Sequence, residues 1–592
     1  MAVKQYKAFD YETTGLNPYK DAKIFSYCIA DEEGNVDICR LDGPKYEREN
    51  NWEKLQDFFL DDTIGKIAHN LKFELAFTRC AGIEIAENTE WHDTMIMSQL
   101  FRNLAPSHAL DYLGWELGRI ARDTDIEISR LSKAYGGYQN VPKDWMTKYQ
   151  YLDGFRTMLL FQLWWPLIQK EAFFEDYLNE IALISVAERM QAYGIDLCMP
   201  ETNKLLKWME DELEQVQKDT FTLFGEYINL NSTDQVARLL YQRLRLPVME
   251  YTEDKKPSTG KDALLKLRKI PNPHPVIELI FKQRSYIKGL AIIRGYLEHA
   301  NNSGVLHSNI KTNHARTGRL ACENPNLMNV AKEEVEKNPY PVPARRCFKS
   351  RQDCVMCFVD YVGLQMLLMI EVSHCHAMQE ILKQGGHPHL EAARIFYGPH
   401  LPEELRFIDK KHSKKLYGAA KNGHFGLAFG AGLPQFADAL NLTIAQAKPG
   451  YDLYCKLYPE IANLTTTTAA MVKEKGYVLT PFNRKLYVSI EKAYVGLNYV
   501  IQGTEAGITK RSLVNLDSYF KQEWNDDIRL VIPIHDEIVF SVPRVIYNKA
   551  KNRIFTDVKY LMTNIPNIKT KLDVEFKMTF GTWDRAKEAR ID

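Results

Sequence analysis

The stretch Arg529-Leu-Val-Ile-Pro-Ile-His535-Asp536-Glu537-Ile-Val-Phe-Ser-Val542 places a polar triplet between two apolar runs that are rich in Val and Ile. Such runs predict the two strands of a buried hairpin, with the triplet at its turn. Carboxylates between apolar strands are costly unless a cation meets them, so Asp536 and Glu537 indicate half of a divalent-metal site. Taken alone, the triplet is equally compatible with a solvated Asp-Glu turn.

A second carboxylate, Asp360, stands near the end of the apolar run Cys354-Val-Met-Cys357-Phe-Val-Asp360-Tyr361. Two strands that each end in Asp can bring their carboxylates to one edge of a sheet, which suits phosphoryl transfer by two metals ~3.5–4 Å apart. Cys354 and Cys357 have the spacing of a zinc-ligand pair. Residues three apart on a strand point to opposite faces, however, so buried free cysteines are favoured over zinc.

These two segments resemble motifs A and C of family A DNA polymerases. The resemblance implies that Asp360 and Asp536 hold two Mg²⁺ ions with help from the Tyr361 carbonyl, and that Mn²⁺ can substitute. It implies a multi-domain α/β fold, in which an RNase H-like 3′–5′ exonuclease domain precedes a right-hand polymerase. The expected parts are the exonuclease domain (1–170), palm (171–200, 306–375 and 498–592), thumb (201–305) and fingers (376–497).

Length and composition agree with several globular domains, since the chain has 592 residues and 45% hydrophobic content. Lys+Arg and Asp+Glu are equal at 76 each, so the basic excess typical of nucleic-acid binding is not visible. Clustered carboxylates within a basic cleft would also sum to zero. The cysteine content and the start of the chain predict a cytoplasmic protein (host cytoplasm if viral) with neither disulfide framework, signal peptide nor membrane span. A monomer is expected.

The N-terminal segment contains the strand Lys7-Ala-Phe-Asp10-Tyr-Glu12, in which Asp10 and Glu12 leave the same face. Tyr149 and Asp153 lie one helical turn apart further along the chain. Together with Glu74, this ordered set resembles the DEDDy 3′–5′ exonuclease domain. The resemblance implies a first metal on Asp10, Glu12 and Asp153, a second between Asp10 and the attacked phosphate, and a Tyr149 that orients the attacking water.

Three other residues of this segment bear on the exonuclease prediction. Glu74 stands where the family usually has Asp, so excision is expected to be weakened or shifted, or the domain to be a scaffold alone. Leu16 matches the apolar wedge against an unstacked terminal base. Asp93 is expected to cap the helix that begins at Thr94 rather than to bind metal.

The thumb segment predicts a long amphipathic helix over 201–224 and a basic, hydroxyl-rich loop, Lys255–Lys261. The loop composition suits contacts to DNA phosphates and suits an ordinary exposed loop equally well. Arg284 and Lys288, one helical turn apart, are candidates for the same backbone. By resemblance, Arg319 and Gln502 probe the minor groove at the primer end. The predicted DNA contacts are Arg319, Arg345, Arg484, Lys485, Asn498, Gln502, Ser258 and Thr259.

The fingers segment carries Lys421, Phe425 and Phe429 at intervals of four, which places them on one helical face. A cation next to aromatic rings suits a dNTP, and by resemblance Lys421 stabilises or protonates the leaving pyrophosphate. Tyr417 replaces the usual Arg of this motif, and Gln365 replaces the Glu that excludes a ribose 2′-hydroxyl. The predicted dNTP contacts are Tyr361, Gln365, His389, Lys414, Phe425 and Phe429.

The function predicted from this set is template-directed DNA synthesis on a primer-template with dNTPs, combined with 3′–5′ proofreading. The alternatives are a stand-alone exonuclease with an inactive polymerase half and a non-catalytic DNA-binding module. The absence of a 5′-nuclease segment and the unusual motifs favour a bacteriophage enzyme. A specialisation for a modified base such as 2-aminoadenine is a further hypothesis, and a processivity partner is not identified.

Overall fold

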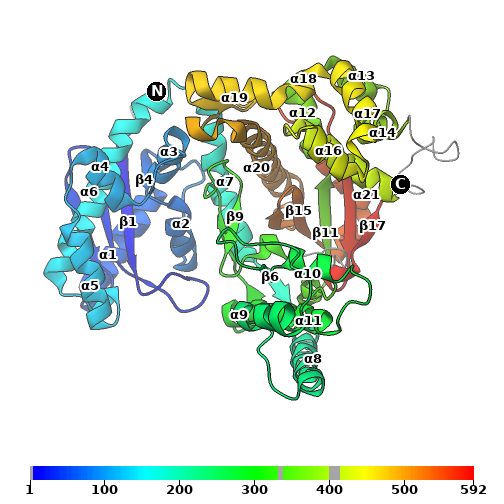
Figure 1. The fold of residues 1–592 in the computed structure, drawn as a ribbon. Coiled ribbons are helices and arrows are strands. Elements are labelled where there is room, and N and C mark those ends of the chain that lie inside the picture. The colour runs from blue at the N-terminus through cyan, green and yellow to red at the C-terminus, as the bar shows by residue number, and fades with distance from the viewer. Residues whose placement is uncertain (1–4, 331–337, 399–413, 592) are drawn as a thin grey trace.

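The computed structural model describes residues 5–330, 338–398 and 414–591, and shows an N-terminal α/β domain joined to a larger C-terminal part (Figure 1). The N-terminal domain has a five-stranded sheet of order β3-β2-β1-β4-β5, in which β4 and β5 run parallel to β1. Its strands are β1 (Gln5–Thr13), β2 (Ile24–Ala30), β3 (Val36–Arg40), β4 (Ile64–Ala68) and β5 (Trp91–Asp93). Its helices are α1 (Lys45–Leu60), α2 (Leu71–Cys80), α3 (Thr94–Phe101), α4 (Leu110–Gly118), α5 (Asp123–Tyr135) and α6 (Lys143–Ile168).

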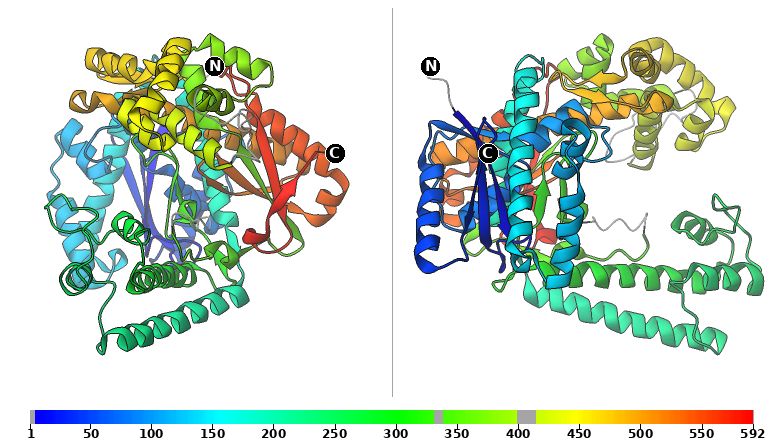
Figure 2. Two further views of the ribbon diagram at one scale, coloured as in Figure 1. Left: turned by 45° about the vertical axis from the view of Figure 1, so that its right-hand side comes forward. Right: turned by 90° about the vertical axis from the view of Figure 1, so that its left-hand side faces the viewer.

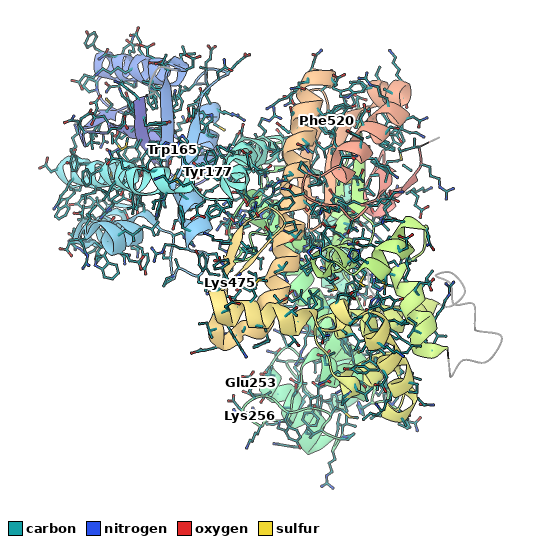
Figure 3. The ribbon with its side chains drawn as sticks, turned by 90° about the horizontal axis from the view of Figure 1, so that it is seen from above. Trp165, Tyr177, Glu253, Lys256, Lys475 and Phe520 are labelled. Atoms are coloured by element: carbon teal, nitrogen blue, oxygen red, sulfur yellow. The ribbon has the colours of Figure 1, made fainter. Side chains whose placement is uncertain are left out.

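The helix α7 (Phe174–Tyr193) connects the two parts of the molecule. It packs on α2 of the N-terminal domain and on α20 and β14 of the C-terminal part. Trp165 of α6 and Tyr177 of α7 lie close together where the two helices meet (Figure 3), with ring centroids 6.3 Å apart. The helix ends at Tyr193 and is followed by Gly194, where a Cβ atom would lie 2.5 Å from the Leu306 carbonyl oxygen.

Two long helices, α8 (Met199–Phe224) and α11 (Val276–His299), pack side by side and project from the body of the molecule (Figure 2). The predicted amphipathic helix over 201–224 is therefore confirmed. Their outer ends form a small core of their own with α9 (Thr233–Ala237) and α10 (Lys261–Leu267). This projection is attached through a three-stranded sheet of β10 (Phe348–Lys349), β6 (Ile195–Leu197) and β7 (Val305–Leu306).

The C-terminal part is built around a second five-stranded sheet of order β14-β15-β11-β16-β17, whose pairs are all antiparallel. The strands are β14 (Arg529–Ile534), β15 (Glu537–Pro543), β11 (Cys354–Tyr361), β16 (Val574–Thr579) and β17 (Lys587–Ala589). The predicted hairpin around His535 is confirmed as β14 and β15. The helices packed on this sheet are α20 (Gly496–Trp524) and α21 (Arg544–Thr563), and α12 (Leu364–Ser373) packs on α20.

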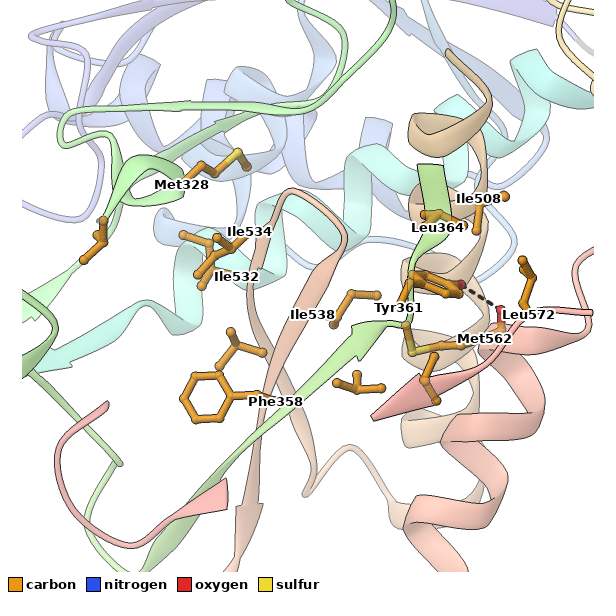
Figure 4. Packing of buried hydrophobic residues seen from close by; sticks show 14 of the residues in the cluster. Met328, Phe358, Tyr361, Leu364, Ile508, Ile532, Ile534, Ile538, Met562 and Leu572 are labelled. Carbon is orange, nitrogen blue, oxygen red and sulfur yellow. Dashed lines mark hydrogen bonds between the residues drawn. The ribbon is translucent and has the colours of Figure 1, made fainter. Parts of the chain in front are cut away.

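The core beneath the second sheet includes Tyr361, which packs among Ile538, Leu364 and Ile508 (Figure 4). Its hydroxyl donates to the Met562 carbonyl at 2.7 Å and lies 2.8 Å from Ser512 Oγ. These bonds tie β11 to α20 and α21, and so fix the strand that carries Asp360.

A helical lobe covers one end of this sheet and lies on the same side of the molecule as the projecting pair α8 and α11 (Figure 2, right). Its helices are α13 (His376–Lys383), α14 (Pro388–Tyr397), α15 (Lys414–Ala428), α16 (Leu433–Leu440), α17 (Ile444–Leu457), α18 (Pro459–Ala462) and α19 (Leu464–Lys475). Two short hairpins complete the fold: β8 (Asn309–Lys311) with β9 (Ala321–Glu323), and β12 (Tyr477–Leu479) with β13 (Lys485–Tyr487). Within the described ranges, no helix combines the length and apolar character needed to cross a bilayer.

Candidate functional site

The N-terminal domain brings four carboxylates together at the end of β1. Oxygen atoms of Asp10, Glu12 and Asp153 lie within 4.8 Å of one another. Glu74, from the first turn of α2, is buried beside them, and its Oε2 finds no hydrogen-bond donor among the residues that the structure describes. Oxygen ligands at this density, with one left unpaired, fit a hard divalent cation such as Mg²⁺.

The electrostatics of this cluster point the same way. Burial raises the pKa of Asp10 from its ordinary 3.8 to about 7. Burial, and then the charges of neighbouring carboxylates, raises the pKa values of Glu12, Glu74 and Asp153 well above their usual range. Such shifts arise when charged groups are crowded away from water, and a bound cation relieves them.

Two residues of α6 hold Asp153 in place. Tyr149 lies one helical turn before Asp153 on α6 and is among the groups that lower the pKa of the Asp153 carboxyl, so the predicted shared helical face is confirmed. Arg156, whose side chain is fully buried, reaches Asp153 at 3.3 Å and Asp125 at 2.7 Å. Sequence analysis missed Arg156, although its position three residues after Asp153 on a helix was an available signal.

The surroundings of the cluster agree with two further predictions. The Asp93 carboxylate accepts from the backbone N–H groups of Met95 and Ile96, which confirms it as the cap of α3. It also accepts from the N–H of Leu71 at 2.8 Å, and thereby positions α2. Leu16 is exposed and borders a cavity of about 460 Å³ that lies between the N-terminal domain and the β8–β9 hairpin.

The second sheet aligns three carboxylates across neighbouring strands. Asp360 of β11 is directly opposite Glu537 of β15 and Glu575 of β16. Directly opposed residues of antiparallel strands point to the same face. Asp536 immediately precedes Glu537 at the β14–β15 turn, so Asp360 and Asp536, which are distant in sequence, become neighbours at one edge of the sheet.

Charged groups surround this carboxylate row. The pKa of Arg345 is lowered by burial, and the charges of Glu537 and Asp360 oppose that shift. Burial of Lys577 disfavours its charge, but Glu575, Glu537 and Asp360 together raise its pKa. Arg345 and Lys577 therefore supply part of the positive charge that was predicted near the turn.

Asp536 also has an acidic neighbour that sequence analysis did not identify. Burial raises the pKa of Asp536, and the charge of Glu505 adds to this shift. Glu505 lies in α20, three residues after Gln502, and no feature of its local sequence distinguished it. Glu575 was missed because its role depends on strand register.

The predicted primer-end residues gather around α20. Arg319 Nη2 lies 2.6 Å from Glu505 Oε2, and Gln365 Nε2 lies 3.4 Å from the same oxygen. Asn498 and Gln502 are joined by a 2.8 Å bond across one turn of α20. The structure thus links Gln365 and Arg319 through Glu505, although the sequence analysis assigned these two residues to separate functions.

The helical lobe carries the predicted nucleotide residues on and around α15. Lys421 Nζ lies 5.9 Å from the centre of the Phe425 ring, so their shared helical face is confirmed. Lys421 and Phe429 are exposed, whereas the side chain of Lys414 lies outside the described residues. His389 is almost fully buried beside Phe425, and its Nδ1 lies 3.1 Å from that of His424.

Arg484 is placed differently from its predicted position on a DNA-facing surface. The side chain is buried, with Nη1 2.5 Å from Glu180 and Nη2 2.7 Å from Asn313 Oδ1. Lys485 is partly exposed and pairs with Glu171 at 2.7 Å. Because the Arg484 guanidinium is bound by buried partners, it does not face a DNA phosphate as predicted.

Thr259 is also placed inward rather than toward DNA. Its side chain is buried, and its hydroxyl accepts from Arg284 Nη2 at 3.4 Å. Arg284 also donates to the Leu230 carbonyl at 3.2 Å, so it braces the loop from inside. Ser258 remains partly exposed and Lys288 is exposed.

Cys357 is fully buried as predicted, whereas Cys354 is partly exposed.

Comparison with known families accounts for most of the chain. Residues 1–169 match the family described as 3′–5′ exonuclease, and residues 199–585 match DNA polymerase family A. The first match contains the four-carboxylate cluster, and the second contains Asp360 and Asp536.

Individual relatives are more distant. The chain is 24% identical to DNA polymerase I of Pseudomonas aeruginosa over 98% of its own length and 63% of that protein. It is 27% identical to the thermostable DNA polymerase I of Thermus filiformis, over 70% of its own length and 49% of that protein. The chain therefore spans about half to two-thirds of the length of these relatives. The POL domain of Pol1 from M. smegmatis, solved with DNA primer-template and dNTP, has a similar fold: TM-score 0.79, 20% identity, 99% of this chain and 96% of that one.

Proposed function

Because the chain belongs to family A of the DNA polymerases, we propose that it is a template-directed DNA polymerase with a proofreading 3′–5′ exonuclease. The observation that carries this proposal is the pairing of Asp360 with Glu537, which makes Asp360 a neighbour of Asp536. Primer-template DNA and dNTPs, the ligands named for the similar mycobacterial structure, are the proposed substrates.

In the polymerase site, Asp360, Asp536 and the Tyr361 carbonyl would hold two Mg²⁺ ions. When bound, such ions activate the primer 3′-hydroxyl and draw charge from the leaving pyrophosphate. Lys421 would meet the triphosphate and stabilise its leaving charge, with Phe425 and Phe429 against the base and sugar. Gln365 would line the sugar pocket. His389 is buried behind Phe425, so it would contact the nucleotide only after the lobe rearranges on nucleotide binding.

In the exonuclease site, Asp10, Glu12, Asp153 and Glu74 would hold two further ions. Tyr149, fixed by Asp153, would orient the attacking water. Leu16 would press against the terminal base of an unpaired strand that enters the adjoining cavity. The raised pKa values indicate that this cluster is arranged for a cation rather than for a structural ion pair.

For the remaining assignments, Arg319, Gln502 and Asn498 would contact the primer end, and Ser258 and Lys485 the DNA backbone. The parts of the chain would be the exonuclease domain (1–170), thumb (201–305), fingers (376–497) and palm (171–200, 306–375 and 498–592). A monomeric state, a cytoplasmic location, a bacteriophage origin and a preference for a modified base stay predictions.

Primer extension with a labelled primer tests both activities of one preparation. D360N and D536N are expected to abolish Mg²⁺-dependent synthesis and to leave single-strand excision intact, whereas D10N is expected to do the reverse. E588Q, at an exposed position of the same sheet, is the matched control. Synthesis that survives D360N would show that Asp360 is not needed for it, whereas wild-type protein that excises but extends no primer would leave the stand-alone exonuclease as the function. Separate reactions with natural dNTPs and with 2-aminoadenine nucleotide test the base preference.

A further inference from the structure

Glu505 is a buried carboxylate that contacts two side chains with different proposed tasks. Its Oε2 lies 2.6 Å from Arg319 Nη2 and 3.4 Å from Gln365 Nε2. The Glu505 side chain is only 6% exposed, whereas that of Arg319 is 31% exposed. One oxygen in the interior therefore anchors two side chains that reach toward the surface.

The backbone around Glu505 leaves little freedom for this carboxylate. It lies near the middle of α20, two residues after Gly503. A Cβ atom at Gly503 would lie 2.4 Å from Leu486 Cδ1 and 3.3 Å from the Thr317 carbonyl oxygen. The helix is thus pressed against the turn that carries Arg319, and the distance between Glu505 and Arg319 is fixed by backbone packing.

The chemistry of a carboxylate determines how its two partners are oriented. A carboxylate only accepts hydrogen bonds, so the amide of Gln365 must present its NH₂ group to Glu505. The carbonyl oxygen of Gln365 is then the end that is left for another ligand. A neutral amide at residue 505 would accept either orientation of Gln365, because an amide both donates and accepts.

Arg319 retains donors while it is held by Glu505. Its buried Nε finds no hydrogen-bond acceptor among the residues that the structure describes. Arg319 and Glu505 also line one small pocket together with His535, the residue before Asp536. The Arg319 side chain is nevertheless 31% exposed, so its guanidinium is held beside the carboxylate row with its exposed part open to a ligand.

We propose that Glu505 is a positioning residue that orients Gln365 and Arg319 together, and thereby controls discrimination both against ribonucleotides and against mispaired primer ends. The inference rests on the proposed polymerase function, since it requires Gln365 to face the incoming sugar and Arg319 to face the primer terminus. The carboxylate adjusts two selections at once because both side chains depend on the same oxygen.

The central experiment measures ratios in E505Q, which keeps the shape of the side chain and removes its charge. Two ratios are determined by single-nucleotide extension: kcat/KM for dNTP over rNTP, and extension of matched over mismatched primer ends. Each ratio is expected to fall about tenfold, the effect of losing one charge-assisted hydrogen bond. E523Q changes an exposed glutamate of the same helix and is expected to leave both ratios unchanged.

A double variant distinguishes positioning from general disturbance of the site. In Q365A the sugar ratio is already reduced, so addition of E505Q is expected to lower it no further, while the primer-end ratio still falls. If circular dichroism shows that E505Q is unfolded, E505D is measured instead. This variant keeps the charge but shortens the side chain by one methylene.

Each outcome decides a separate point. Wild-type protein that extends no matched primer would overturn the proposed function itself. Wild-type synthesis with both ratios unchanged in E505Q would overturn the role of Glu505 alone. Equal further loss of the sugar ratio in the Q365A background would show that Glu505 does not act through Gln365.

Discussion

Gly318 lies directly on the guanidinium group of Arg484: a Cβ atom at residue 318 would lie 2.9 Å from Arg484 Cζ. Arg484 is held in turn by Glu180 of α7 and by Asn313. The turn that presents Arg319 is therefore supported from beneath by a buried ion pair, and Arg484 serves the primer-end residues indirectly.

The first prediction concerns this support. R484M is expected to destabilise the protein by about 1–3 kcal/mol, because Glu180 and Asn313 lose a buried partner while Lys510 still pairs with Glu180. R553M removes ion pairs that are mostly exposed and is expected to cost less than about 1 kcal/mol. Urea unfolding followed by fluorescence measures both. Equal midpoints for the two variants would contradict a supporting role for Arg484.

The second prediction concerns Gly318 itself. G318A is expected to lower the free energy of unfolding by about 2 kcal/mol, because residue 318 has φ +80° and the added methyl group meets the Arg484 guanidinium. G136A, at a positive φ of 74° but with open space around the Cβ, separates backbone strain from the contact. The contact explanation fails if G318A and G136A lose the same stability.

The third prediction is a dependence of stability on pH in the absence of metal. Between pH 3.8 and about 7, folded Asp10 keeps a proton that the unfolded chain has released, so its stabilising contribution is lost as pH rises through about 7. In buffer that contains a chelator, the melting temperature of D10N relative to that of wild type is therefore expected to increase from pH 5 to pH 8.

The same preparation tests the metal. Mg²⁺ is expected to raise the melting temperature of wild type at pH 8, since a ligand that binds only the folded state stabilises it. D10N is expected to respond much less. A Mg²⁺ response of the same size in both proteins would place the ion away from Asp10.

The fourth prediction concerns Glu74. E74A is expected to reduce excision of single-stranded DNA by about 100-fold, because an inner carboxylate of the cluster is lost. Primer extension is expected to stay at the wild-type level, since α2 lies in the other domain. E84A, at an exposed position of the same domain, is the control. Full excision by E74A would show that Glu74 is dispensable.

The fifth prediction concerns Tyr361. Y361F leaves the Met562 carbonyl without its buried donor and the Ser512 hydroxyl without its acceptor, and is expected to cost about 1–3 kcal/mol. Y494F, at an exposed tyrosine, is expected to be neutral. Denaturant midpoints compare the two. A neutral Y361F would mean that the hydroxyl does not help to fix β11.

Local patterns predicted those features that depend on neighbours in sequence. The hairpin at His535 followed from alternating apolar and polar runs, and the cap at Asp93 from its position before Thr94. The spacing of Tyr149 and Asp153 on one helical face gave their contact. In each case the relevant partner lies within a few residues, where backbone geometry alone determines the distance.

The errors concern residues whose partners are distant in sequence. Arg484 was predicted to face DNA, yet Glu180, more than 300 residues earlier, binds it in the interior. Thr259 was predicted to face DNA because nothing in its loop revealed Arg284 beneath it. Glu505 was not noticed at all, because its importance comes from Arg319 and Gln365, which only the tertiary fold brings to it.

The connection made by α7 affects how a primer terminus moves between the two proposed active sites. Lys510 and Arg484 both bind Glu180 of this helix, and Arg511 binds its Asp176, so charged clamps join it to the C-terminal part. The helix α7 also packs against α2. We therefore expect the two parts of the molecule to keep a fixed relative orientation. A misincorporated terminus must then travel to the nuclease as a frayed strand, and we expect the ease of melting the last base pairs to set how often an error is excised.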